Sequence, residues 1–502
     1  MRINNNINSN INSNVNFKGP LDGAVTGLLR TCDMNEMVNA VGLDVGAMVI
    51  PRAYYDTKQR NQYAGAETFF REISGTFINC LAAGIFAKWI AKFMASRGEV
   101  KINPNNWFSK DSMDTLQAAW NGNVKKYSTS VFENLSGRDG YKINEFKNIN
   151  WKNIEWVDEE KWNNIKWKDN KYKNILNKLT SKEGFINTMT QIIEDSSIAE
   201  SDKNHVLSIM EKRLVNALGA ERDIELNING NKLFARLDNI LRDTHDMGKD
   251  VFLVNGGKDA KKILARISKV NKTKAFGAIA AASVLGLSNQ FINRKITEKR
   301  TGKKGFVGDV DFTSTFRGEK KKDNLLLLKK IGASALMIGM VTSVMGVKNL
   351  KQFAKKLEFT GPITSGNAIK TVYAANIVGR FMAADNGTEL RESMTRDYLG
   401  FLNWLVFGGF AVKGVANLFD KKGKDLFNYS KKGTGLKHWL KDMNLKSHNE
   451  IASKGKEFAK KNMWKVNLAQ GAGIAYSAIT LGFLLPMLNA KVTEHKSRKL
   501  VA

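Results

Sequence analysis

The sequence predicts an all-α fold: a multi-helix membrane domain with an internal duplication, and a mainly helical soluble insertion in its first copy. Three observations support this prediction. Several apolar segments are long enough to cross a bilayer, the two halves of the chain share collinear sequence matches, and a long polar region interrupts the first half. Together they indicate two related three-segment units joined by one further helix, a 3+1+3 order.

The clearest candidate for a membrane span is 466–490, which holds no charged residue over 25 positions. At about 1.5 Å per residue, a helix of this length exceeds the roughly 30 Å hydrocarbon core of a bilayer. Asp44 and Arg380 interrupt two weaker candidates, which favours short or interfacial helices there, while Lys88 and Lys413 can snorkel to the headgroups. The other predicted segments are 36–55, 73–95, 275–293, 331–347, 367–384 and 398–419.

An internal duplication is predicted because three matches occur in the same order in both halves. The offset between matched positions falls from 342 to 196 along the chain, which indicates a long insertion in the first copy. The matched stretches are 17–21 with 359–363, 71–88 with 396–413, and 286–298 with 482–494.

These observations divide the chain into six parts. The first is an Asn-rich tail, predicted to be disordered, and it lacks the apolar core of a signal peptide, so no cleavable signal is predicted. The parts are the tail at 1–15, the first part of repeat unit 1 at 16–96, a polar insertion at 97–270, the closing helix of repeat unit 1 at 271–300, a linker with a central apolar helix at 301–357, and repeat unit 2 at 358–502.

The composition favours a partner of negative potential. The formal net charge is +30, so anionic lipid headgroups are the expected partner, with nucleic acid and acidic proteins as less favoured alternatives. Within the insertion, four tryptophans lie five or six residues apart at 151–167. They fit a small packed domain, a headgroup surface, or a surface that stacks nucleic-acid bases.

The sequence contains none of the motifs that carry common enzymatic chemistry. There is no phosphate-binding G-x-x-x-x-G-K-[ST] loop, no H-E-x-x-H pair and no G-x-S-x-G nucleophile elbow. The five histidines and two cysteines show no metal-ligand spacing, and two cysteines cannot form a disulfide framework. We therefore predict no enzymatic activity, no cofactor and no metal.

Charged pairs that recur in both copies are the leading candidates for a functional site. Ionisable groups beside hydrocarbon are costly unless they are paired or hydrated. We expect Arg52 to pair with Glu72, and Arg380 with Asp397, so that the first helix of each copy is tied to the second. Alternatively, these residues anchor helix ends at headgroup level. The candidates are Arg52, Arg71, Glu72, Arg380, Arg396 and Asp397.

A second repeated pattern, N-x-K-[IV]-T-E, closes the third apolar segment of each copy. The favoured interpretation is a helix end, where asparagine satisfies the last carbonyls and lysine complements the helix dipole. The alternative is a ligand-binding role for the two glutamates. The residues are Asn293, Lys295, Glu298, Asn489, Lys491 and Glu494.

The predicted function is that of a multi-pass integral membrane protein, either transporter-like or a membrane scaffold, with a basic soluble insertion. The alternative is a soluble or peripheral helical interaction protein that binds anionic lipid, an acidic partner or nucleic acid. Basic residues flank almost every apolar segment, so the positive-inside rule assigns no orientation.

Overall fold

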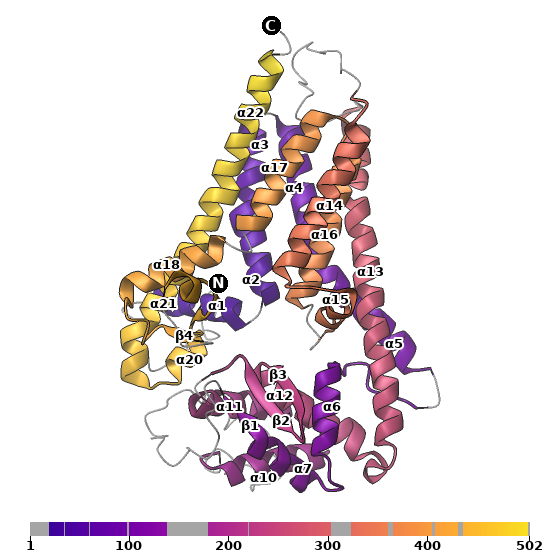
Figure 1. Cartoon of the computed structure of the whole chain (residues 1–502), viewed down its shortest axis with the longest axis vertical. Coiled ribbons are helices and arrows are strands. Elements are labelled where there is room, and N and C mark those ends of the chain that lie inside the picture. Colours follow the sequence, from indigo (N-terminus) through magenta and orange to yellow (C-terminus); the bar gives the residue numbers. More distant parts are fainter. Residues whose placement is uncertain are drawn as a thin grey trace, which may run out of the picture.

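Long helices dominate the fold and gather into a bundle that stands on a smaller mixed domain (Figure 1). The structure is a computed structural model of the 502-residue chain. It describes residues 20–34, 36–59, 61–97, 100–137, 179–218, 220–302, 323–359, 365–403, 407–429 and 435–499. The predicted disordered tail at 1–15 and the tryptophans at 151–167 lie outside the described residues.

Two continuous helical segments begin the bundle after α1 (Pro20–Met34). Each contains a π-helical stretch, a local widening of the helix that is often found at functional sites. The first consists of α2 (Glu36–Gly42), a π turn (Leu43–Val49) and α3 (Ile50–Gln59), and the second of α4 (Gln62–Phe77), a π turn (Ile78–Ala82) and α5 (Ala83–Ala95). Both segments extend beyond the predicted 36–55 and 73–95.

The helix α13 (Ala260–Thr301) belongs to both parts of the molecule. Its 42 residues span about 63 Å at 1.5 Å per residue. Ile263 and Ile267 pack in the core of the mixed domain, whereas Ala278 packs in the core of the bundle. The predicted boundary between insertion and closing helix, at 270, therefore falls inside one unbroken helix.

The second half of the bundle contains the linking helix α14 (Leu326–Val344) and the short α15 (Leu350–Lys356). The closing segment is longer than the predicted 466–490, because polar residues at both of its ends remain helical. The remaining elements are α16 (Gly366–Ala383), α17 (Gly387–Leu402), α18 (Gly408–Phe419), α21 (Lys456–Ser477), a π turn (Ala478–Leu484) and α22 (Leu485–Lys499).

The mixed domain packs helices around a small antiparallel sheet of order β1-β2-β3. Asn229 and Gly230, with φ of 51° and 83°, connect β2 to β3, as an Asn-Gly hairpin turn requires. The strands are β1 (Leu135–Ser136), β2 (Ile224–Ile228) and β3 (Asn231–Ala235), and the helices are α6 (Lys110–Ala119), α7 (Val124–Asn134), α10 (Lys182–Glu194), α11 (Glu200–Leu218) and α12 (Leu237–Met247).

A second, two-stranded sheet lies between α18 and α21. It pairs β4 (Phe427–Tyr429) with β5 (Met443–Leu445), accompanied by the short helices α19 (Leu436–Lys441) and α20 (His448–Ala452). The prediction of a mostly helical protein is confirmed. Neither sheet was predicted, although the Asn-Gly pair was a readable hairpin signal.

Among the residues that the structure describes, four helices are long and apolar enough to cross a membrane. They are Gln62–Ala95, Ala260–Arg300, Leu326–Val344 and Glu457–Val492. Their outer faces carry exposed large apolar side chains, among them Trp89, Val284 and Leu336. Helices with this surface are compatible with a membrane protein.

Candidate functional site

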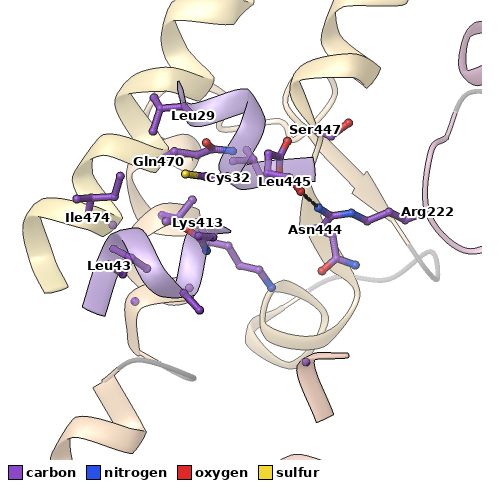
Figure 2. Close-up of a pocket in the computed structure, with 18 of the residues that line it drawn as sticks. Leu29, Cys32, Leu43, Arg222, Lys413, Asn444, Leu445, Ser447, Gln470 and Ile474 are labelled. Atoms are coloured by element: carbon purple, nitrogen blue, oxygen red, sulfur yellow. Dashed lines mark hydrogen bonds and ion pairs between the residues drawn. The ribbon is translucent and has the colours of Figure 1, made fainter. Parts of the chain in front are cut away.

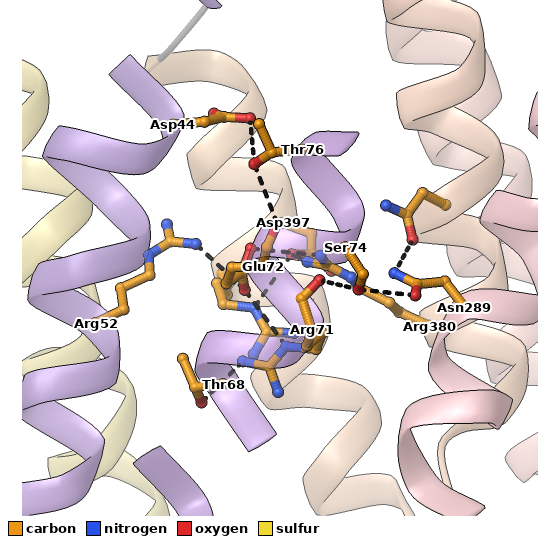
Figure 3. A network of polar contacts seen from close by, with 12 residues as sticks. Asp44, Arg52, Thr68, Arg71, Glu72, Ser74, Thr76, Asn289, Arg380 and Asp397 are labelled. Atoms are coloured by element: carbon orange, nitrogen blue, oxygen red, sulfur yellow. Dashed lines mark hydrogen bonds and ion pairs between the residues drawn. The ribbon is translucent and has the colours of Figure 1, made fainter. Parts of the chain in front are cut away.

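The six charged residues singled out in the sequence converge between four helices of the bundle (Figure 3). We call this group the arginine–carboxylate cluster. It consists of the arginine of α3, the Arg-Glu pair of α4, the arginine of α16 and the Arg-Asp pair of α17. Five of the six are more than nine-tenths buried, and the side chain of Arg396 is 11% exposed.

Matching helix starts help to place these residues. Asn61 caps α4 by accepting a hydrogen bond from the Ala64 N–H, and Asn386 caps α17 by accepting one from the Glu389 N–H. In both helices, the arginine of the charged pair follows ten positions after the capping asparagine. An asparagine side chain satisfies one of the backbone donors that a helix N-terminus leaves unpaired.

Both ion pairs expected from the sequence are formed. Arg52 Nη1 lies 3.7 Å from Glu72 Oε1, and Arg380 Nη1 donates to Asp397 Oδ1 at 3.0 Å. The neighbouring arginines add to each carboxylate, with Arg71 Nε 3.3 Å from Glu72 and Arg396 Nε 3.2 Å from Asp397. Each carboxylate therefore has two arginine partners from its own half of the chain.

One further contact joins the two halves. Arg380 Nη2 lies 3.4 Å from Glu72 Oε2, so Glu72 is shared by three arginines. Glu72 and Arg380 are 308 residues apart, and no local sequence pattern predicts this pair. It depends on how α4 and α16 pack together.

Backbone and hydroxyl groups complete the arginine–carboxylate cluster. Arg52 Nε donates to the Leu481 carbonyl at 2.9 Å, which ties α3 to the closing segment. Arg71 Nη2 donates to Thr68 Oγ1 at 3.2 Å. Asp44, predicted as an interruption of an apolar segment, accepts a hydrogen bond from Thr76 Oγ1 at 3.2 Å and is 8% exposed.

A row of amide side chains, not singled out in the sequence analysis, lies beside the arginine–carboxylate cluster. Ser74 Oγ donates to Asn289 Oδ1 at 2.9 Å, and Asn289 Nδ2 donates to Asn376 Oδ1 at 3.4 Å. Asn376 Nδ2 in turn donates to Asn79 Oδ1 at 3.3 Å. The available signal was the presence of asparagine within three separate apolar segments, since polar side chains often join helices in a membrane.

The chemistry of the arginine–carboxylate cluster favours a structural role. Arginine remains charged at any physiological pH, so these side chains are poor proton carriers. Paired charges that are buried and hydrogen-bonded hold helices in one arrangement, because removing one partner leaves a buried charge unmatched. The cluster can therefore fasten α3, α4, α16 and α17 to one another.

The helix-end interpretation of the second repeated pattern is wrong. α13 continues to Thr301 and ends at Gly302, whose φ of 66° is typical of a glycine C-cap, and α22 continues to Lys499. The sequences after both asparagines contain no glycine or proline before these ends, so nothing stops the helix. Asn293 and Asn489 consequently lie within helices and face other helices.

The residues of this pattern have different environments in the two halves. Asn489 Nδ2 donates to the Glu392 carbonyl at 3.0 Å, whereas buried Asn293 lines a cavity of about 270 Å³ beside Arg300. Lys295 and Lys491 are exposed, and Glu298 is half-buried. For Glu494 the structure describes the helical backbone alone.

A larger cavity of about 660 Å³ lies where the bundle meets the mixed domain (Figure 2). Lys413 reaches into it and donates a hydrogen bond to the Leu440 carbonyl at 3.1 Å, instead of extending to headgroups along the outer surface. Lys370, Lys446 and Arg222 also line it. We call this space the basic cavity.

Next to the basic cavity, a polar junction fixes the mixed domain to the rest of the chain. Asp33 of α1 accepts hydrogen bonds from the His448 N–H at 3.0 Å and from Arg222. Glu221 of the mixed domain accepts one from Ser447 Oγ at 2.8 Å. Burial alone would raise the pKa of Asp33, but the hydrogen bonds and charges of His448 and Arg222 outweigh it and lower that pKa.

Within the described ranges, no group of three or more His, Cys, Asp or Glu side chains is placed to hold a metal ion. Comparison with known proteins adds no relative from which a role could be transferred. The sequence matches no family model, and no curated protein and no solved structure is similar to it.

Proposed function

We propose that this chain is a multi-pass integral membrane scaffold built from two related helical units that hold a soluble domain at the membrane surface. The observation that carries the proposal is the buried arginine–carboxylate cluster within a bundle of apolar helices. Such charges persist in an apolar layer when they are paired with one another across helices. Here Arg380 pairs with Asp397 of its own half and with Glu72 of the other half of the chain.

The outer surface of the bundle supports a membrane location. Exposed large apolar side chains recur along every candidate span, such as Trp89 at 64%, Val284 at 61% and Leu328 at 66% exposure. Soluble monomers rarely expose large apolar side chains repeatedly along several long helices. Lipid chains would cover these faces, and anionic headgroups would accept the basic residues that flank them.

Two helix crossings support the proposed duplication. Gly286 of α13 packs against Asn376 of α16, and Gly482, its equivalent in the second unit, packs against Ala47 and Pro51 of the first. A Cβ at Gly286 would lie 3.1 Å from the Asn376 nitrogen, and one at Gly482 would lie 2.5 Å from the Ala47 oxygen. The closing helix of each unit thus packs on the first helix of the other.

The side chains next to these crossings support the same relation. Asn289 contacts Asn376, and Leu485, the equivalent of Asn289 at the offset of 196, packs in an apolar cluster with Met48. Met48 precedes Arg52 by four residues, as Asn376 precedes Arg380. Contacts that exchange in this way are expected of two units related by a two-fold rotation. If all seven predicted segments span the membrane, the linking helix gives both units the same orientation, and the rotation axis runs along the membrane normal, as in parallel transporter repeats.

A scaffold is favoured over a transporter by the pairing within the arginine–carboxylate cluster. Glu72 contacts three arginines and Asp397 contacts two, so each carboxylate is already engaged by protein partners. Carboxylates shared among arginines fit a fastening role better than a substrate site.

The membrane proposal predicts that the full-length chain stays in the pellet after alkaline carbonate extraction, because apolar helices that cross the bilayer remain in it. An unrelated peripheral protein, expressed beside it, would be released and serves as the control. Labelling of single cysteines introduced at 60, 303–322, 345–349, 384–386 and 430–434 would then show on which side each connection lies. Release of the chain into the supernatant would overturn the proposal in favour of a peripheral or soluble interaction protein.

A further inference from the structure

The basic cavity combines two kinds of wall. One wall is apolar and is formed by bundle residues that include Leu29, Leu43 and Ile474. The other presents cationic and amide side chains, with Lys413 extending between the two walls (Figure 2). A cavity of about 660 Å³ lies within the usual range of small-molecule sites. This lining suits a ligand that has one apolar part and one anionic part.

The cationic side chains come from parts of the chain that are distant in sequence. Lys370 belongs to the first turns of α16, Lys413 to α18, Lys446 follows β5, and Arg222 precedes β2 of the mixed domain. Their convergence is therefore a product of the tertiary fold. These four cationic side chains outnumber the three carboxylates of the lining, and this excess of positive charge attracts an anion.

The acidic residues of the wall already have protein partners. Asp33 accepts hydrogen bonds from Arg222 and His448, and Glu450 accepts them from Ser447 and Asn428. Asp223, the third, also has a partner among the described residues. Asp33 and Glu450 are thus engaged in the polar junction.

Lys413 is the residue best placed to meet a ligand. Its ammonium group has three N–H donors, and its hydrogen bond to the Leu440 carbonyl at 3.1 Å uses one of them. Lys446 donates to the carbonyls of Lys424 and Asp425 at 3.0 and 2.7 Å from the cavity wall. A phosphate group beside Lys413 would receive charge-assisted hydrogen bonds, which are stronger than neutral ones.

The location selects the kind of ligand. The cavity is lined by Gly366 and Ile369 at the start of α16 and by Arg222 of the mixed domain, so it lies where the bundle helices meet the water-exposed part of the protein. Basic pockets between membrane helices at this level are suited to lipid headgroups. We propose that the basic cavity binds the phosphate group of an anionic lipid, with the start of its acyl chains against the apolar wall; this rests on the proposed membrane location.

The natural cysteines give a direct measure of occupancy. Cys32 lines the cavity, while Cys80, the other cysteine of the chain, is 1% exposed. In the detergent-purified full-length protein, short-chain phosphatidylglycerol should slow alkylation of Cys32, as measured by peptide mapping. The same concentration of short-chain phosphatidylcholine or of inorganic phosphate should give little protection, because the choline lipid carries no net negative charge and inorganic phosphate has no acyl chains.

The chain contains a matched control for the lysine that contacts the ligand. Lys88 occupies the position in the first unit that corresponds to Lys413, but it is exposed on α5. Lys413→Gln combined with Lys370→Gln should weaken phosphatidylglycerol protection about tenfold, the loss expected for a charge-assisted hydrogen bond. Lys88→Gln should leave the protection within about twofold, because one exposed charge adds little. Lys413→Arg should retain the protection, because arginine keeps the positive charge and the N–H donors.

Three results would overturn the lipid site. The first is equal protection by phosphatidylcholine. The second is protection by inorganic phosphate alone at the same concentration, which would indicate a soluble phosphate ligand. The third is an equal loss of protection in the Lys88 and Lys413 variants, which would indicate general surface attraction. An unchanged alkylation rate of the variants without lipid shows that the cavity is intact. Carbonate release combined with Lys413-dependent protection would reject the integral membrane proposal and leave the anionic site standing.

Discussion

At the scale of single residues, the central feature is the sharing of carboxylates among arginines. Glu72 contacts Arg52, Arg71 and Arg380, whereas Asp397 contacts Arg380 and Arg396. Buried ion pairs add little net stability compared with apolar residues, but they make one helix arrangement strongly preferred over arrangements that separate the charges. The arginine–carboxylate cluster therefore determines which helices pack together as much as it stabilises the bundle.

Neutralising the shared carboxylate should destabilise the bundle. Glu72→Gln leaves three arginines around an uncharged amide, and a broken buried pair costs about 3–5 kcal/mol. Asp385→Asn is the control, because it removes a carboxylate that pairs with Arg294 but is 41% exposed, and such pairs are worth about 1 kcal/mol or less. The unfolding temperatures of both variants and of the natural chain can be measured in detergent. Equal, small shifts would show that Glu72 contributes no more than a surface charge.

At the scale of helices, small residues decide how closely the bundle packs. Ala82, Ala87, Ala278 and Ala282 form much of the core around α5 and α13. At the crossing of α13 and α16, Gly379 lets the backbone of Leu287 approach closely. Close backbone approach through small residues is a general means of association in membrane helices, where no water-driven force operates between them.

The α13–α16 crossing gives a prediction with a built-in control. In Gly379→Ala the new Cβ would lie 2.4 Å from the Leu287 carbonyl oxygen and 2.7 Å from its Cα, so the helices must separate. We expect a loss of about 1–3 kcal/mol in unfolding free energy. Gly339→Ala on α14, where no atom lies within 4 Å, should be neutral or slightly stabilising. Similar denaturation midpoints for the two variants would contradict the close crossing.

At the scale of the whole molecule, one helix and one junction couple the mixed domain to the bundle. α13 passes through both cores without a break, and the Asp33, Arg222 and His448 contacts join the opposite side. Two attachments at separate points restrict rotation of the domain about either one. A domain held in this way keeps one orientation relative to the bundle, as the proposed scaffold role requires.

The junction should weaken in acid. Because the folded pKa of Asp33 is lowered, its contribution to stability is fully present above its unfolded pKa of about 3.9 and is lost as pH falls through the lower folded value. Asp33→Asn should therefore lower the unfolding temperature at pH 7, and its difference from the natural chain should shrink as pH falls below about 4. Glu225→Gln, which removes the partially exposed Lys232 pair, is the control. A difference that stays constant with pH would exclude Asp33 as the titrating group.

Much of the architecture could be predicted from local patterns. The apolar segments 275–293 and 466–490 predicted long helices, and those helices are present, because an uninterrupted apolar stretch favours the backbone-satisfied helical form. The pairing of Arg52 with Glu72 and of Arg380 with Asp397 followed from burial of charges on consecutive helices. The two sheets were missed, since their strands are two to five residues long and lie among helical segments.

By itself, the sequence determined which segments are helical and apolar, and which charges must find partners, because these properties depend on neighbours along the chain. The tertiary structure decided which partners they find. Glu72 with Arg380, Gly379 against Leu287, and the meeting of Lys413 with Arg222 at one cavity all join residues far apart in sequence. Such contacts depend on the relative placement of helices, which no local pattern encodes.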